Sequence, residues 1–319
     1  MSNRTLTPLY VLVQRIRDFI NEPRRKQILL SDLELWNQLC SSMDVLGDSE
    51  LAVVAYQGLS ATGEPGDLYL GAYGLLQALY LEQDAVNNLC ESLQIEESIE
   101  KYPRLLQIRE VRNFSVGHPT KMRGVKRSGR PPSYNYISRP TLRREGFQII
   151  SFFTGGQHEF VDVNIPELIA DQHAYLEDIL KRVVTYLQDD EEAHKARFRM
   201  EKLVDFFPHT IEYHLRKVAE AVRGKELPAI GTIDLSVVEK ALAQFKDALS
   251  KRASTAYDAV DYVYKEIDFP LSQIKAFLVG TPSVGDPRAI EIFISYVGSR
   301  IEELRKLASE IDAYYQERA

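Results

Sequence analysis

The segment from Asp67 to about Leu93 constrains the fold more than any other part of the chain. Its apolar residues recur at intervals of three, four or seven: Leu75, Leu79, Val86 and Leu89. That spacing places them on one face of an α-helix, whereas a strand would show strict alternation. The segment therefore predicts a long amphipathic helix and favours a mainly α-helical protein.

Other segments carry helix signals bounded by prolines and glycines. Pro8 suits the first turn of a helix, where its missing N–H costs nothing, and the stretch from Ser31 to Glu34 has the form of a capping box. We expect helices over these segments: Pro8 to Asn21, Ser31 to about Gly47, about Ile95 to Val116 with a start or a kink at Pro103, Pro166 to about Leu187, Ile233 to Ile267, and Pro287 to Glu317. A further apolar segment, Leu51 to Leu59, leads to a loop. Pro270 and the loop from Gly280 to Asp286 are expected to separate elements in the last third.

Three short runs rich in β-forming residues interrupt the helical pattern: Tyr134 to Ile137, Phe147 to Phe153 and Glu159 to Val163. Gly155-Gly156 lies between the last two runs and predicts a hairpin turn. We therefore expect a mainly α fold with a small antiparallel β insert at about 133–164. A length of 319 residues indicates two domains: a helical domain at 1–190 that contains the insert, and a C-terminal helical region at 191–319.

Composition limits the class of protein and its partners. The formal net charge is -7, which favours solubility and argues against wholesale wrapping by nucleic acid, while leaving room for a local basic site. No apolar run approaches the roughly 20 residues of a membrane span. We therefore expect a cytoplasmic protein that does not enter a membrane.

The cysteines and histidines carry no signal for a metal or a cofactor. Cys40 and Cys90 lie in amphipathic helical patterns and are expected to be reduced core thiols, with a disulfide between them as the alternative. His209 and His214 lack the HExxH spacing and a third ligand. The sequence thus predicts neither a bound metal nor a cofactor.

The segment from Lys121 to Arg144 contains eight basic residues and no acid. In a chain of net charge -7 this favours a surface that faces RNA. The expected RNA-binding residues are Lys121, Arg123, Lys126, Arg127 and Arg130. A solvated loop is the alternative interpretation. Tyr134 and Tyr136 could stack on bases, but cross-strand packing explains them equally well.

One short motif carries chemistry: Arg112-Asn113-Phe114-Ser115-Val116-Gly117-His118. Six residues rotate an unbroken helix by about 600°, which would turn His118 away from Arg112. A helix end at Gly117, reinforced by Pro119, removes that constraint. The sequence therefore predicts a turn at Gly117 that lets the histidine fold back beside the arginine.

A guanidinium and an imidazole side by side supply what metal-free RNA cleavage needs. The guanidinium offers a planar fork of donors to phosphate oxygens and stays charged. The imidazole titrates near neutrality, so it can exchange a proton with the ribose 2′-hydroxyl or the leaving oxygen. Asn113 would orient the histidine or the phosphate. Because DNA lacks the 2′-hydroxyl, this chemistry would be limited to RNA.

The motif resembles that of the HEPN superfamily, in which an arginine, usually followed by a polar residue, is separated by four to six residues from a histidine. The likeness covers roughly Pro8 to Leu187 and includes the helix before the motif. It implies a helical bundle that forms a homodimer with a shared cleft. It also implies a metal-independent endoribonuclease, of a class that includes toxins and phage-defence effectors, with Arg112, Asn113 and His118 as catalytic residues. The β insert is not part of the minimal bundle. The C-terminal third, which resembles nothing known to us, would serve assembly or dock an inhibitor or partner protein.

Two simpler interpretations stay open. Arg112 could form a structural ion pair with Glu82 as the supporting acid, because Glu82 lies on an otherwise apolar helix face and needs a partner. His118 could instead serve only as a helix C-cap residue, near the negative end of the helix dipole. The rival function is therefore a non-catalytic HEPN-like module that binds RNA or protein.

Overall fold

The computed structural model describes residues 7–60, 63–117, 119–121, 132–252, 258–281 and 285–317. The fold is mainly α-helical with one small antiparallel sheet, which confirms the predicted fold class. The chain divides into two compact units, Met1–Ile20 with Leu29–Leu187 and Asn21–Ile28 with Gln188–Ala319. Within the described ranges, none of the helices combines the length and hydropathy needed to cross a bilayer.

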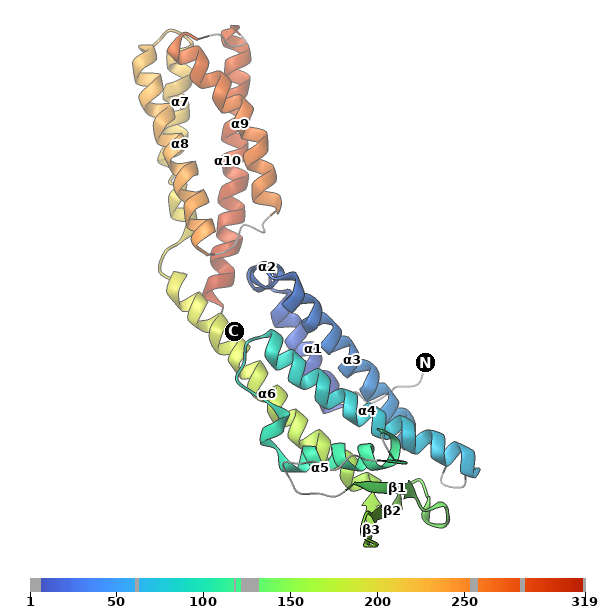
Figure 1. Ribbon diagram of the computed structural model, residues 1–319. Coiled ribbons are helices and arrows are strands. Elements are labelled where there is room, and N and C mark those ends of the chain that lie inside the picture. Colours follow the sequence, from blue (N-terminus) through green and yellow to red (C-terminus); the bar gives the residue numbers. More distant parts are fainter. Residues whose placement is uncertain are drawn as a thin grey trace. The chain divides into compact units, whose positions relative to one another are not determined.

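The first unit is a bundle of long helices with the sheet beside it (Figure 1). Its elements are α1 (Pro8–Asn21), α3 (Leu33–Gln57), α4 (Pro65–Ser92), α5 (Pro103–Arg112), β1 (Ser133–Ile137), β2 (Gly146–Phe153), β3 (His158–Asn164) and the first part of α6 (Ile165–Phe198). The predicted apolar stripe of α4 is buried in the bundle, with Leu79 and Leu89 fully enclosed. Burying a leucine side chain contributes about 1.5–3 kcal/mol, so this stripe holds the helices together.

The sheet has the strand order β1-β2-β3, and both pairs are antiparallel. Gly155 and Gly156 have φ values of 115° and 86°, a conformation that glycine adopts without a steric penalty, and they form the predicted hairpin turn. On one face of the sheet, Phe147 and Ile149 are buried in the core of the first unit. The other face is exposed and is described below.

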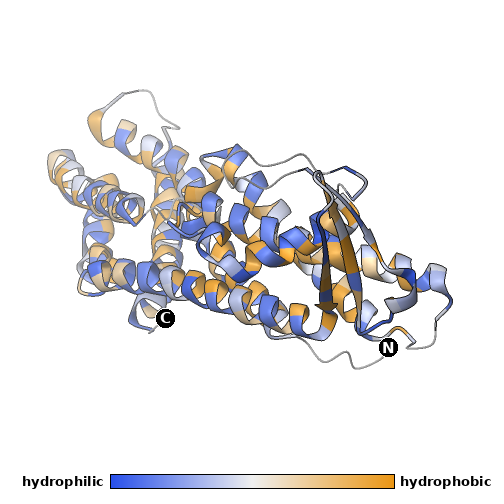
Figure 2. Ribbon diagram, turned by 60° about the horizontal axis from the view of Figure 1, so that its bottom comes forward, coloured by the Kyte–Doolittle hydropathy of each residue, from blue (hydrophilic) through white to orange (hydrophobic). Residues whose placement is uncertain are grey.

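The second unit is helical throughout its described residues (Figure 1). Its elements are α2 (Pro23–Leu30), the last part of α6, α7 (Thr210–Val222), α8 (Pro228–Lys251), α9 (Asp258–Val279) and α10 (Pro287–Gln316). Its own apolar core contains the fully buried rings of Phe207 and Phe245, whose centroids are 4.8 Å apart. In Figure 2 the helices carry hydrophobic residues in stripes between hydrophilic ones, as expected of helices with one buried face.

Two predicted helix boundaries in the first unit are wrong. Helix α3 begins after Asp32 rather than at Ser31, because the Asp32 carboxylate accepts hydrogen bonds from the backbone N–H groups of Glu34 (3.0 Å) and Leu35 (3.1 Å). The same helix continues through Gly47, where an end was expected. A glycine costs a helix only about 1 kcal/mol, which the packing of the flanking turns offsets.

Three further boundaries are wrong. Helix α6 does not stop at Leu187 but continues to Phe198. Two acids in this continuation are neutralised, because Arg24 donates to Asp190 at 2.7 Å and to Glu191 at 3.1 Å. The predicted helix from Ile233 to Ile267 is divided between α8 and α9, with 253–257 outside the described residues. Pro270 lies inside α9 rather than at a break.

Candidate functional site

Arg112 is the last residue of α5, and a π-helical turn, Asn113–Gly117, follows it directly. Phe114 in this turn is buried in the core of the first unit, which anchors the turn. The turn carries the backbone of Gly117 onto the arginine: a Cβ atom at Gly117 would lie 2.6 Å from Nη1 of Arg112 and 3.2 Å from Oδ1 of Asn113. Because real Cβ contacts are not that short, this arrangement requires a glycine.

The guanidinium of Arg112 is held by neutral groups. Its Nε and Nη2 donate to Oε1 of Gln77 on α4 at 3.1 and 2.8 Å, and its Nη1 donates to Oδ1 of Asn113 at 3.0 Å. Its Cζ lies 4.4 Å from the centroid of the Tyr80 ring. These bonds use three of the five N–H groups of the guanidinium. Among the described residues no carboxylate forms an ion pair with Arg112.

Arg109, one helical turn earlier, stacks on the same Tyr80 ring at 4.5 Å. Its charge, however, is neutralised by an ion pair between Nη2 and the Asp84 carboxylate. Its Nε also donates to Oε1 of Gln83 at 2.7 Å. Tyr80 therefore contacts two arginines, one with a counter-charge and one without.

The other predicted site residues follow Gly117 in the chain. His118, Arg123, Lys126, Arg127 and Arg130 lie outside the described residues, whereas Lys121 is described and exposed. The described residues that flank position 118 are both held in place. Gly117 contacts the arginine, and the carbonyl of Pro119 accepts a hydrogen bond from the backbone N–H of Asn135 on β1 at 2.6 Å.

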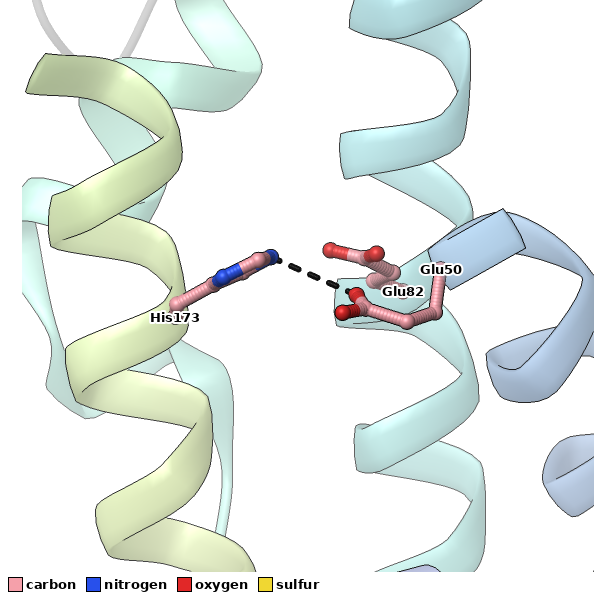
Figure 3. Close-up of side chains that lie close together, drawn as sticks. All are labelled: Glu50, Glu82 and His173. Atoms are coloured by element: carbon pink, nitrogen blue, oxygen red, sulfur yellow. Dashed lines mark ion pairs between the residues drawn. The ribbon is translucent and has the colours of Figure 1, made fainter. Parts of the chain in front are cut away.

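Glu82, predicted as the acid that supports Arg112, lies in a different cluster. Figure 3 shows it on α4, pointing toward Glu50 on α3 and His173 on α6. His173 Nε2 lies 3.3 Å from Oε2 of Glu50, and one ligand atom from each of the three residues lies within 4.8 Å of the others. Glu82 is fully buried and Glu50 nearly so. The ionisable neighbours of Glu82 are thus a histidine and a second acid rather than an arginine, and its hydrogen-bond donor is the amide of Gln172.

The protonation of this cluster follows from burial and charge. Burial raises the pKa of Glu82 to about 8, so at neutral pH its carboxyl group is mostly protonated. Burial, the largest single influence, disfavours the ionised form of Glu50, but hydrogen bonds with His173, Thr7 and Glu82 and the charge of His173 together outweigh it and hold the pKa of Glu50 below its ordinary value. The same carboxylate raises the pKa of His173 against the opposing effect of burial.

Two glutamine side chains connect this cluster to α5. Gln172 Nε2 donates to Oε2 of Glu82 at 2.7 Å and to the carbonyl of Leu79 at 2.8 Å. Gln172 Oε1 accepts from Nε2 of Gln83 at 2.7 Å, and Gln83 in turn accepts from Arg109. The second oxygen of Glu82, Oε1, is buried and accepts no hydrogen bond from the described residues.

The sequence contained a signal for the residues of this cluster that we did not predict. Glu50 lies four residues after Leu46 and three before Val53, both of which are buried. His173 lies four residues after Ile169 and three before Leu176, which are also buried. Polar residues at apolar spacing on three helices were the evidence for a shared buried site.

The exposed face of the sheet is aromatic. In one row across the strands Tyr134 faces Phe152, which faces His158, and in the next row Tyr136 and Phe160 flank Ile150. The four Tyr and Phe side chains are 44–55% exposed. The rings of Tyr136 and Phe152 stack with centroids 6.2 Å apart. Cross-strand packing therefore occurs on this face, and it leaves much of the ring surface open to solvent.

The cysteines are free thiols, which confirms the preferred prediction. The histidine pair of the second unit does not form a metal cluster within the described residues, because His214 pairs through Nδ1 with Oδ1 of Asp234 at 2.7 Å. Comparison with known proteins finds no match: no family model, no curated protein and no solved structure is similar to this chain. The function must therefore be inferred from the chemistry of the site itself.

Proposed function

We propose that the protein is a metal-independent endoribonuclease of the HEPN type, with Arg112, Asn113 and His118 as its catalytic residues. The observation that supports this most is the guanidinium of Arg112, which is partly buried, fixed by neutral partners and, within the described part of the chain, not paired with an acid. A partly buried charge is costly unless an opposite charge meets it. A phosphate group of RNA would provide that charge.

The contacts of Arg112 prepare it for such a ligand. Gln77 fixes one edge of the guanidinium through two hydrogen bonds and Tyr80 covers its face, so the remaining N–H groups have a defined direction before RNA binds. Donors fixed in advance stabilise a developing negative charge without reorganising during the reaction. Arg112 would thus bind the scissile phosphate and stabilise its oxygens in the transition state.

His118 would move the proton in this mechanism. The ribose 2′-oxygen attacks the adjacent phosphorus, its proton passes to a base, and the bond to the 5′-oxygen of the next nucleotide breaks as that oxygen gains a proton. The products are a 2′,3′-cyclic phosphate and a 5′-hydroxyl. An imidazole can serve at either step.

The RNA would approach along the β1 side of the site. The turn after Arg112 packs on β1, and the basic segment from Lys121 to Arg130 precedes β1 in the chain. In this proposal two copies form a homodimer in which both motifs share one cleft. The helices of the second unit dock an inhibitor or another partner protein, as in a cytoplasmic toxin or phage-defence effector.

The test is cleavage of RNA by the purified protein in the presence of EDTA. The parent should produce cyclic-phosphate ends, and Arg112→Ala and His118→Ala should not. Arg104→Ala is the matched control, because Arg104 lies on the same helix but its charge pairs with Asp171 at the surface, with Nε 2.6 Å from the carboxylate. Equal background cleavage by all four proteins would refute the proposal.

A second candidate is binding of RNA without cleavage, and the exposed aromatic face of the sheet favours it. Aromatic side chains stack on bases of any sequence, at about 1–3 kcal/mol per base. If the parent binds single-stranded RNA with salt-sensitive affinity but leaves it intact, the module is a binder. The affinity should then depend on Tyr136 and Phe152 rather than on His118.

A further inference from the structure

We propose that Glu50, Glu82 and His173 bind one divalent transition-metal ion, of which Zn²⁺ fits best, in the core of the first unit. The site goes beyond the proposed function, because the RNA chemistry described above uses no metal. It joins three helices, α3, α4 and α6, through one side chain from each (Figure 3).

The donor set suits such an ion. Zinc is bound by histidine nitrogens and by Asp or Glu oxygens, and a site with three protein ligands leaves a fourth position to water. Zinc binds these atoms at about 2.0–2.2 Å, and the three candidate atoms here lie within 4.8 Å of one another. Small rotations of the side chains would bring all three to one ion. Because neutral imidazole and two carboxylates balance a divalent charge, the buried site would be neutral overall.

One polar atom in the cluster indicates a missing ligand independently of this spacing. Glu82 is fully buried and its side chain points into the cluster; when this carboxyl group is ionised, its Oε1 accepts no hydrogen bond from the described residues, and without an ion a proton shared with Glu50 takes that place. A buried oxygen without a hydrogen-bond donor lowers the stability of the fold by about 1–3 kcal/mol, so such atoms are uncommon unless a ligand binds them. A metal ion would satisfy it.

The surroundings of Glu82 are those of a metal ligand. Gln172 donates to Oε2 of Glu82, which fixes the carboxyl group beside Glu50 and His173. Gln172 is itself fully buried and fixed by hydrogen bonds with Leu79 and Gln83. Hydrogen bonds that orient a ligand in this way typically change metal affinity by 10–100-fold.

The candidate ligand atoms are enclosed. Glu50 lines a cavity of about 450 Å³ between α1 and α3, but both of its carboxylate oxygens and Nε2 of His173 are buried. An ion would therefore enter only when these side chains move, and it would then be held away from solvent.

The proposal is tested by metal content. The untagged full chain is stripped with a chelator, dialysed against Zn²⁺ and then against metal-free buffer, and analysed by inductively coupled plasma mass spectrometry. We expect about one zinc per chain in the parent. Glu82→Gln and His173→Gln should each lose it, and zinc should raise the melting temperature of the parent but of neither variant.

His214→Gln is the matched control, since His214 also pairs with a carboxylate but has no third donor nearby, and it should keep the ion. Circular dichroism of the metal-free variants checks that loss of zinc is not loss of fold; Glu82→Gln also keeps the shape of the residue and removes one buried acid. The proposal is overturned if the folded parent retains less than a tenth of an equivalent. It is equally overturned if both variants retain as much zinc as the parent. In either case the cluster is a proton-sharing pair of acids with a histidine.

Discussion

Replacing Gly117 by alanine adds a single methyl group directly beside the guanidinium of Arg112 in the proposed active site. That methyl group would lie 2.6 Å from Nη1 and 3.4 Å from Cζ of Arg112. An ordinary contact is about 1 Å longer, so the guanidinium must move by roughly that amount. A misplacement of about 1 Å costs on the order of 100-fold in rate, equivalent to about 2.7 kcal/mol in the activation free energy. We therefore expect kcat/KM for RNA cleavage to fall about 100-fold.

The stability of Gly117→Ala should change little. The atoms in the way belong to the end of a flexible side chain, and the backbone at Gly117 is not in the left-handed region. Alanine in place of glycine also favours helical backbone by up to about 1 kcal/mol. We expect the free energy of unfolding, measured in urea, to stay within about 1 kcal/mol of the parent value.

The assay compares cleavage of a labelled RNA in EDTA by the parent, Gly117→Ala and Gly74→Ala. Gly74 lies on α4, and a Cβ there would meet nothing within 4 Å, so this variant adds the same methyl group without a contact. It should keep full activity. If Gly117→Ala cleaves RNA within threefold of the parent, the position of the Arg112 guanidinium does not matter, and the proposed mechanism fails.

Three other predictions follow from the described contacts. The double variant Tyr136→Ser with Phe152→Ser should weaken RNA binding, by about 1–3 kcal/mol per lost stacked base, without loss of melting temperature; unchanged affinity in a filter-binding assay would exclude the sheet as an RNA surface. Gln172→Leu removes the donor to Glu82 and should destabilise the first unit by about 1–3 kcal/mol per buried group left unsatisfied, which urea unfolding measures; a midpoint equal to the parent's contradicts this. Burial lowers the pKa of His194 to about 4, so between pH 6.5 and 4 the unfolded chain binds more protons than the folded one and stability falls with falling pH. Replacing His194 with Gln should reduce the loss of unfolding free energy between pH 6.5 and 4 by about 1–2 kcal/mol, a value discounted because the His194 side chain is partly exposed to solvent. Identical pH–stability curves for the variant and the parent would refute this.

Local signals predicted the fold class but not the lengths of the helices. The hairpin at Gly155-Gly156 was predictable because a tight turn has few chemical solutions. The continuity of α6 was not, since it depends on Arg24, more than 160 residues away in sequence, neutralising Asp190 and Glu191. Such long-range neutralisation leaves no trace in the local pattern. Pro270 within α9 is a similar case, in which the helix continues despite a residue that locally favours a break.

The burial of Glu82 was predictable, but its partners were not. The helical spacing showed that Glu82 faces the core, and therefore that it needs a partner. Identifying that partner requires knowing which helices lie beside α4 and at what height, and those depend on the packing of the whole bundle. The sequence suggested Arg112 as the partner of Glu82, but the guanidinium of Arg112 donates hydrogen bonds to the amide oxygen of Gln77 instead. The cluster with Glu50 and His173 thus became visible only in three dimensions.

Charge balance, rather than position, distinguishes the two arginines on Tyr80. Arg109 and Arg112 lie one turn apart on α5 and stack on the same ring. If both were structural, both would be expected to have a counter-ion, because both are partly buried and a buried charge without a counter-charge is costly. Asp84 neutralises the first, while the second is held by an amide oxygen. An amide directs a guanidinium without cancelling its charge, which is the arrangement expected where the cancelling charge arrives with a ligand. The difference between the two side chains therefore argues for an anion at Arg112 independently of the motif in which it lies.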